Sequence, residues 1–389
     1  MRIRSVDYDL DSGIVEIGYD GGTVQRESVP ASPEARATSI RRYQVDFSAG
    51  RLLLHLPNGR RATVELAIPG SSAAALLGAR IVLYLDQNLW SRLAAARYAH
   101  RPVPPREATA AHVLEQLVAD RRIILPVSAG HFLETARHRG PNRLPLASTL
   151  LELCGGWQMR HPGVIGATEL VGSITNQPMI TRTDIFTLEP NATFLRPFPA
   201  PAPRYPEPLG SILSNVIAAT ATYDTIIDPT ALTEEGAEVR GKWAQAQDAL
   251  VELLAEEDRP GDFVRRAALG RLLFDYAGEE LRTGRRVDLQ AIQSWLTQAA
   301  DEVTTMPYLG RLWRLMFMRL RNGAPWSGND LVDIHNLSAA AGYADVVAGE
   351  KRTIGELRSA KPVTIGARLA TSLEEAAAAV AQLLARRRA

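Results

Sequence analysis

Acidic side chains at the ends of predicted strands and on predicted helix faces are the groups of this sequence best suited to chemistry. Asp86 directly follows the apolar run Ile81–Leu85. In a parallel sheet, ligands bind beyond the carboxyl ends of the strands, so we expect the Asp86 side chain to lie in that position. A carboxylate removed from water is costly unless it is paired or bound to a metal ion. Asp86 is therefore the first candidate metal ligand.

A second acid, Glu134, lies on a helix predicted over about residues 130–138, with His131 three residues before it. Residues three apart share one face of a helix. Glu134 is thus a candidate ligand, and His131 a candidate contact for a substrate phosphate or a metal-bound water. The alternative for His131 is a hydrogen-bonded histidine with a structural role.

Asp330 and Asp333 lie three residues apart on another predicted helix, which begins near Asn329. Two like charges on one face repel each other, and a bound cation would relieve that repulsion. Ser327 and Asp330 also fit the Ser-x-x-Asp pattern that opens helices, which gives Asp330 a structural alternative. For Asp333 the alternative is a solvated helix face.

The fourth acid of the site is open between Glu350, Asp345 and Asp333. Asp345 lies within a strand predicted over 343–348, and Glu350 follows that strand. Both lie near a sheet end, where ligands bind. Asp345 could instead face solvent, and Glu350 could pair with the neighbouring Lys351 or Arg352.

Two polar residues beside these acids are candidates for contact with substrate. Asn88 could orient Asp86 as a metal ligand through a hydrogen bond, or it could cap the helix that follows. Arg352 could contact a substrate phosphate. We exclude His335 from the carboxylate face, because it lies five residues from Asp330, about 140° around the helix.

The oxygen-rich acid set favours Mg²⁺ or Mn²⁺ over zinc, since the sequence holds a single cysteine, Cys154. Such ions activate water and stabilise a leaving oxygen at a phosphodiester. We expect Asp86, Glu134, Asp330 and Glu350 to be the catalytic acids. The expected metal ligands are Asp86, Glu134 and Asp330, completed by Asp333 or Asp345.

The elements predicted around these residues belong to an α/β fold. Residues 2–67 show alternating strands separated by turn signals, typical of antiparallel hairpins. Short apolar strands at 81–85 and 123–126 alternate with helices predicted over 89–98, 107–120 and 130–138, which indicates a doubly wound α/β unit.

The middle of the sequence interrupts this pattern. Residues 161–240 are poor in regular signals, and 189–208 contain seven prolines. Helical spacing then predicts four helices, over 241–257, 262–283, 288–303 and 307–321. Near the end we expect a helix over 329–341, a strand over 343–348, a helix over 353–359, a strand over 362–365 and a helix over 372–388.

These patterns divide the chain into four segments. They are a small β-rich domain (1–75), the first part of an α/β domain (76–160), a proline-rich segment with a helical insertion (161–322), and the second part of the α/β domain with a C-terminal helix (323–389).

The order of acids on these elements resembles the PIN-like nuclease domain. The stretches that carry the resemblance are Leu85–Asn88, His131–Glu134, Asn329–His335 and Tyr343–Lys351. It covers about residues 80–140 and 325–370, and its connection between Glu134 and Asp330 is much longer than is usual in the family. The resemblance implies a three-layer α/β/α fold with a central parallel sheet, Mg²⁺ or Mn²⁺ binding, and hydrolysis of RNA, often as a bacterial toxin.

Composition limits the partners that we expect. The formal net charge is +1, so no overall electrostatic attraction to nucleic acid is visible, and a local basic patch stays open. The N-terminus lacks the apolar run of a signal peptide, and no run reaches the roughly 20 residues that a bilayer requires. We expect a cytoplasmic endoribonuclease without a membrane partner. Two alternatives stay open, a DNA nuclease and an inactive binding or regulatory protein. An inhibitor protein and oligomerisation also stay open.

Overall fold

The computed structural model describes most of the chain and divides it into two compact units that are interleaved along the sequence. The described residues are 3–28, 39–56, 59–66, 72–138, 140–178, 180–195, 209–227, 234–255, 261–283, 287–298, 300–360 and 366–387. Unit 1 comprises residues 1–80, 90–159 and 186–233, and unit 2 comprises residues 81–89, 160–185 and 234–389.

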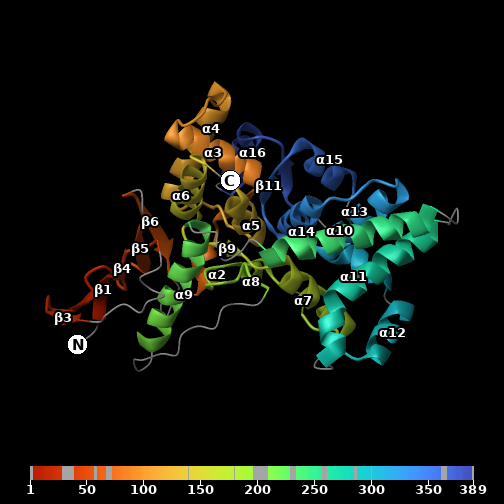
Figure 1. The fold of residues 1–389 in the computed structure, drawn as a ribbon, viewed down its shortest axis with the longest axis horizontal. Helices are drawn as coiled ribbons and strands as arrows, with labels where there is room; N and C mark the ends of the chain where they lie inside the picture. Colours follow the sequence, from red (N-terminus) through yellow and green to blue (C-terminus); the bar gives the residue numbers. More distant parts are fainter. Residues whose placement is uncertain are drawn as a thin grey trace. The chain divides into compact units, whose positions relative to one another are not determined.

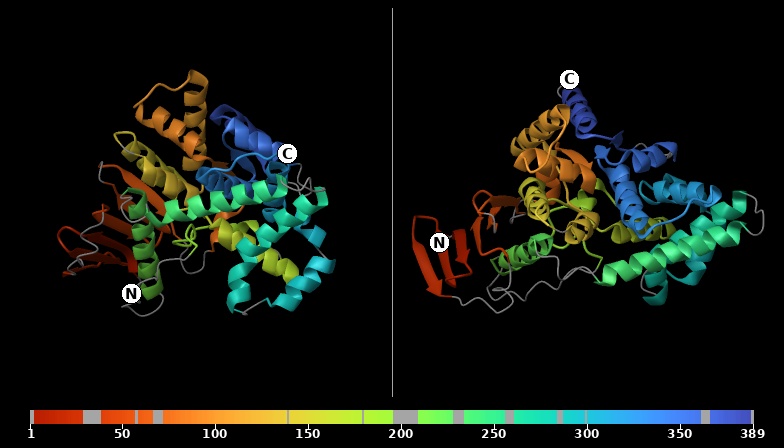
Figure 2. Two further views of the ribbon diagram at one scale, coloured as in Figure 1. Left: turned by 45° about the vertical axis from the view of Figure 1, so that its right-hand side comes forward. Right: turned by 45° about the horizontal axis from the view of Figure 1, so that its top comes forward.

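Unit 1 begins with a six-stranded antiparallel sheet, which confirms the predicted hairpins. Its strands are β1 (Ile3–Asp9), β2 (Ile14–Tyr19), β3 (Val24–Ser28), β4 (Arg42–Asp46), β5 (Arg51–His55) and β6 (Arg61–Glu65), in the spatial order β3-β2-β1-β4-β5-β6. Figure 2 shows these strands side by side in red. The paired residues Val45 and Leu52 are buried. Alternation therefore buries one face of the sheet, as the period of a strand requires.

Helices and three short strands complete unit 1. They are α2 (Ala73–Leu77), α4 (Pro105–Ala119), β8 (Ile123–Ile124), α5 (Ala129–Arg137), α6 (Arg143–Cys154), β9 (Gln158–Met159), β10 (Phe186–Thr187) and α9 (Leu209–Ile227). The backbone N–H of Glu65 donates to the carbonyl of Gly155 at 2.8 Å, which ties the end of β6 to the end of α6. Cys154 is buried, as a small core thiol.

The centre of unit 2 is a set of parallel strands in the order β12-β11-β7, which confirms the predicted parallel sheet. Figure 1 labels β11, the middle strand of the three. They are β7 (Ile81–Leu85), β11 (Val346–Ala348) and β12 (Arg368–Ala370). Every residue of β7 and β11 is buried. Since neighbouring side chains of a strand point to opposite faces, both faces of these strands are covered. Helix α14 (Gly328–Tyr343) packs on β11, and α16 (Leu373–Arg386) packs on β7, β11 and β12.

The remaining helices of unit 2 include the predicted helical insertion. They are α7 (Pro162–Ile174), α8 (Arg182–Ile185), α10 (Glu234–Ala255), α11 (Gly261–Thr283), α12 (Leu289–Gln298), the 3₁₀ helix η2 (Ala300–Thr305), α13 (Leu309–Arg321) and α15 (Lys351–Ser359). Helix α3 (Gln87–Tyr98) begins in unit 2 and continues in unit 1.

Two expectations about these elements are wrong. Residues 161–240 contain long helices, α7 and α9, although their β-branched and glycine-rich sequences have low helix propensity. The strand predicted over 343–348 begins only at Val346, because Tyr343 ends α14. The strand predicted over 362–365 and residues 196–208 of the proline-rich segment lie outside the described residues.

The mixed α/β class, with one parallel and one antiparallel sheet, is thus confirmed. The finer expectation of a three-layer PIN-like fold stays a prediction, as do the segment boundaries. Within the part of the chain that the structure describes, no helix is both long and apolar enough to cross a membrane.

Candidate functional site

Asp86 and Glu350 lie together at the carboxyl ends of two neighbouring parallel strands. Asp86 follows β7, Glu350 follows β11, and the backbone N–H of Glu350 donates to the Asp86 carboxylate at 3.0 Å. The Asn88 side-chain amide donates to the Glu350 carboxylate. Asp86, Asn88 and Glu350 therefore form one group, which we call the strand-end cluster. The sequence predicted this neighbourhood for all three residues.

Helix starts and strand pairing hold the strand-end cluster in place. The N–H of Asp86 donates to the carbonyl of Ala348 at 2.9 Å, which extends the pairing of β7 with β11 by one residue. Asp86 then caps α3, because its carboxylate accepts the N–H of Asn88 at 2.6 Å. Glu350 is the N-cap residue of α15. Both carboxylates thus lie at helix N-termini, where the helix dipole stabilises negative charge.

Gly349 has no side chain, and the Asp86 carboxylate lies next to the space that a side chain there would fill. A Cβ atom at position 349 would lie 3.1 Å from an Asp86 carboxylate oxygen and 3.4 Å from the side chain of Leu337 on α14. A neighbour would have to move by a few tenths of an ångström to admit this atom, so the close approach of the two strand ends favours glycine. Gly349 was not among the residues predicted from the sequence, although a glycine between a strand and a predicted helix was a visible signal.

Asp330 lies in a separate group of charges at the start of α14. Its carboxylate accepts the backbone N–H of Ser327 at 2.7 Å in a capping box, and it pairs with the Arg319 guanidinium at 2.9 Å. Burial opposes ionisation, but the bonds from Ser327 and the charge of Arg319 outweigh it and hold the pKa of Asp330 below its ordinary value. Asp330 therefore has the helix-capping role that the Ser-x-x-Asp pattern predicted as the alternative to metal binding. Its partner Arg319 was not predicted from the sequence.

Arg352 connects the Asp330 group with the start of α15. Its guanidinium lies 3.8 Å from the Asp330 carboxylate and 3.4 Å from that of Glu356, and its side chain is 65% exposed. Two residues before Arg352 in the chain is Glu350 of the strand-end cluster. Arg352 therefore remains accessible to a phosphate group near that cluster.

Asp333 lies on the face of α14 that turns toward the strand ends. It is one turn before Leu337, whose side chain lies beside Gly349. One turn of helix corresponds to about 5.4 Å along the axis. Asp333 thus shares that face of α14 with Leu337, and its role as a ligand stays a prediction.

Asp345 is at the opposite end of the strands from the strand-end cluster. Its carboxylate accepts the N–H of Val82 at 2.7 Å and pairs with Arg182 at 2.8 Å and with Arg387 at 3.1 Å. Val82 precedes Asp86 by four residues, about 13 Å along a strand. The expectation that Asp345 shares a metal ion with Asp86 does not agree with this position, because the strand begins later than the sequence predicted.

Glu134 and His131 lie on α5 of unit 1. His131 is buried, its Nδ1 accepts the N–H of Ser128 at 2.9 Å, and its ring packs edge-on against Trp90. These contacts match the alternative prediction, a hydrogen-bonded histidine with a structural role. They do not support contact of His131 with a substrate phosphate or a metal-bound water. The ligand role of Glu134 stays a prediction.

The donor atoms of the strand-end cluster suit a hard divalent cation. Mg²⁺ is usually held by one or two carboxylates, with water or substrate phosphates completing its coordination. Asp86 and Glu350 supply such carboxylates, and Asn88 adds an amide. Among the residues that the structure describes, no three His, Cys, Asp or Glu side chains are close enough to form a metal-binding group.

Comparisons with known proteins add no relative. No family model matches the chain, and no similar curated protein or solved structure was found.

Proposed function

We propose that this chain is a metal-dependent nuclease that hydrolyses phosphodiester bonds, and specifically an endoribonuclease. The observation that carries the proposal is the strand-end cluster, where Asp86 and Glu350 approach each other across neighbouring parallel strands. This is the position at which α/β folds bind their ligands.

The residues of the cluster have separate parts in this proposal. Asp86 and Glu350 would hold Mg²⁺ or Mn²⁺, and Asn88 orients Glu350 through its amide hydrogen bond. When bound, such an ion supplies an activated water and stabilises the leaving oxygen. Arg352, exposed on α15, would position a phosphate group through charge-assisted hydrogen bonds. Asp330 and Asp333 of the same unit are proposed as further ligands, the ligand role of Glu134 stays a prediction, and Asp345 is not proposed.

A cleavage panel tests the activity and its substrate. The full chain is incubated with labelled single-stranded RNA and with DNA of the same sequence, in Mn²⁺ and in EDTA. Internal cleavage of RNA in Mn²⁺ alone is the expected result. Cleavage of DNA but not RNA would replace the substrate assignment with a DNA nuclease. No cleavage of either nucleic acid would contradict the proposed activity.

The second candidate is a binding or regulatory protein without catalytic activity. The ion pair of Asp330 with Arg319 favours it, because an acid already neutralised by a buried arginine is a poorer metal ligand. Calorimetry with Mn²⁺ distinguishes the two candidates. A nuclease of the proposed kind binds Mn²⁺ at the strand-end cluster and loses that binding on Asp86→Asn, whereas the second candidate gives no heat of binding for either protein.

A further inference from the structure

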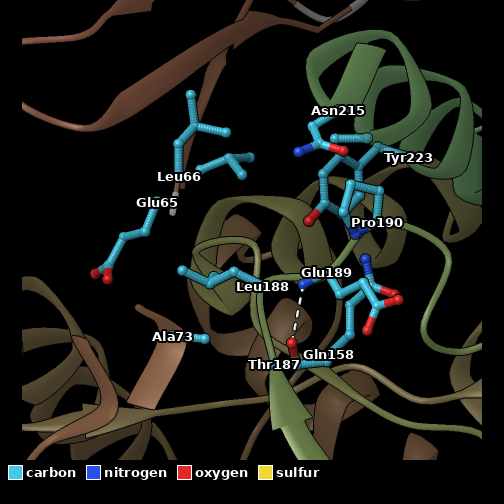
Figure 3. Close-up of a pocket in the computed structure, with 12 residues that line it drawn as sticks. Glu65, Leu66, Ala73, Gln158, Thr187, Leu188, Glu189, Pro190, Asn215 and Tyr223 are labelled. Atoms are coloured by element: carbon cyan, nitrogen blue, oxygen red, sulfur yellow. Dashed lines mark hydrogen bonds between the residues drawn. The ribbon is translucent and has the colours of Figure 1, made fainter. Parts of the chain in front are cut away.

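Unit 1 contains a cavity of about 240 Å³ that belongs to neither group of acids described above (Figure 3). Its walls come from the end of β6, the start of α2, the strands β9 and β10 with the loop after β10, and one face of α9. The α9 residues Asn215, Ala219 and Tyr223 are spaced four apart, so they line the cavity along one stripe of the helix.

The cavity has aliphatic walls of the kind that a flat ring contacts. Leu66, Leu188 and Pro190 lie around its centre in Figure 3, and Ala219 adds a small surface on α9. Cavities for drug-sized ligands measure about 300–1,000 Å³. This cavity is smaller, so its size suits a single ring system.

Two side chains give the cavity hydrogen-bonding capacity. The Tyr223 hydroxyl points toward its centre in Figure 3, although the ring itself is buried. Gln158 also bonds Tyr223, and its Oε1 accepts the N–H of Thr193 at 3.3 Å. The Gln158 amide N–H therefore donates to Tyr223, which leaves the Tyr223 proton to donate to a ligand. At the other side of the cavity, the Asn215 amide offers one donor group and one acceptor.

The charge of the lining disfavours anions. Glu65 and Glu189 contribute carboxylates, and the described lining residues include no lysine, arginine or histidine. The nearby Arg80 pairs with Glu65 at 2.8 Å, and both of these side chains are largely buried. A ligand with a negative charge would therefore lie near the carboxylates of Glu65 and Glu189, and it would compete with Glu65 for Arg80.

We propose that this cavity binds a nucleobase, meaning a neutral planar heterocycle that carries both donors and acceptors. The Asn215 amide can make paired hydrogen bonds to the edge of a base, as asparagine does with adenine. The Tyr223 hydroxyl then donates to a ring nitrogen or carbonyl, and the aliphatic walls cover the faces of the ring. Base binding here does not require the nuclease activity proposed above.

Saturation-transfer NMR on the full chain tests this site with adenine, orotate and cyclohexanol as probes. Adenine is expected to bind. Orotate, a planar ring of similar size with a carboxylate, is expected to bind at least tenfold more weakly. Cyclohexanol is expected to bind weakly, because its single hydroxyl cannot pair with both the donor and the acceptor of the Asn215 amide at the same time. Equal binding of cyclohexanol and adenine would overturn the proposal, as would tighter binding of orotate.

Variants locate the binding. Tyr223→Phe should weaken adenine binding about fivefold, the effect of one hydrogen bond worth about 1 kcal/mol. Asn215→Ala removes two hydrogen bonds and should weaken adenine binding about thirtyfold. Gln245→Ala, which removes an exposed amide from α10, is the matched control and should leave the affinity unchanged. Asn215 is also exposed, so its variant tests the site even if Tyr223→Phe affects folding. Adenine affinity that is unchanged in Asn215→Ala would contradict the assignment.

Discussion

Gly349 shows how one missing side chain shapes the strand-end cluster. Gly349→Ala would place a methyl group 3.1 Å from an Asp86 carboxylate oxygen. We expect this variant to move Asp86 and weaken Mn²⁺ binding severalfold in calorimetry, with a thermal midpoint within a few degrees of the wild type. The expected cause is local displacement, since the backbone does not need a left-handed conformation there.

Gly355→Ala is the matched control for this prediction. Position 355 lies within α15, and a Cβ atom there meets nothing within 4 Å. Replacing a helical glycine with alanine should stabilise the fold by about 0.5–1 kcal/mol without changing Mn²⁺ affinity. If both variants bind Mn²⁺ as the wild type does, Gly349 has no role in positioning Asp86.

Asp330 has a stabilising role that does not depend on metal. Asp330→Asn weakens the capping box and removes one of the two ion-pair partners of the buried Arg319, which keeps its pair with Glu356 at 2.9 Å. We expect the free energy of unfolding to fall by about 1–2 kcal/mol in urea denaturation without added metal. Asp333→Asn, one turn further along α14, should change it by less than about 1 kcal/mol. Equal effects of the two variants would show that the Arg319 pair contributes little.

At the scale of elements, a buried polar network joins the helices of unit 2. His335 on α14 bonds the hydroxyls of Tyr276 on α11 and of Tyr308, the N-cap residue of α13, at 2.8 and 2.9 Å. Burial lowers the pKa of His335 to about 3, with the charges of His161 and Arg271 as smaller causes. His335 is therefore neutral in the folded protein. The uncharged imidazole joins α11, α13 and α14 through its hydrogen bonds to the two tyrosine hydroxyls.

This network predicts a pH dependence of stability. The unfolded chain protonates His335 near pH 6.5, whereas the folded chain resists protonation down to about pH 3. Stability from this residue is therefore complete above pH 6.5 and falls by up to about 1.4 kcal/mol per pH unit below it. The pKa of His161, lowered by burial to about 4, adds in the same direction. The pKa of Asp275, raised by burial to about 6, acts in the opposite direction between pH 4 and 6.

Comparison of the wild type with His335→Gln isolates the contribution of one residue. Urea denaturation at pH 7, 6, 5 and 4 gives the unfolding free energy of each protein, and their difference should shrink as the pH falls below 6.5. A difference that stays constant from pH 7 to pH 4 would mean that His335 titrates alike in the folded and unfolded chains.

Elements with strong local signals were predictable from the sequence, and those set by tertiary contacts were not. The all-apolar Ile81–Leu85 and the Ser327 cap gave β7 and the start of α14 nearly to the residue. The end of α14 was not predictable, because Tyr343 is held in the helix region by its hydroxyl bond to buried Glu169. That shift leaves Asp345 directly before β11, at the end of the strand that lies away from the candidate site.

At the scale of the whole molecule, the candidate site depends on residues that are distant in sequence. The bond between Glu350 and Asp86 spans 264 positions. The order of the strands was predictable as an α/β pattern, so a meeting of Asp86 with a later acid could be expected. Which later acid completes the pair follows from the register of β11 against β7, and a sequence pattern does not specify that register.

The most direct test of the proposed function is the rate of Mn²⁺-dependent cleavage of single-stranded RNA by the wild type and by Asp86→Asn. Glu374→Gln, which neutralises an exposed carboxylate at the start of α16, serves as the matched control. We predict that Asp86→Asn lowers the rate at least a hundredfold, while Glu374→Gln cleaves at the wild-type rate. Full metal-dependent cleavage by a folded Asp86→Asn protein would contradict the proposed function of the strand-end cluster.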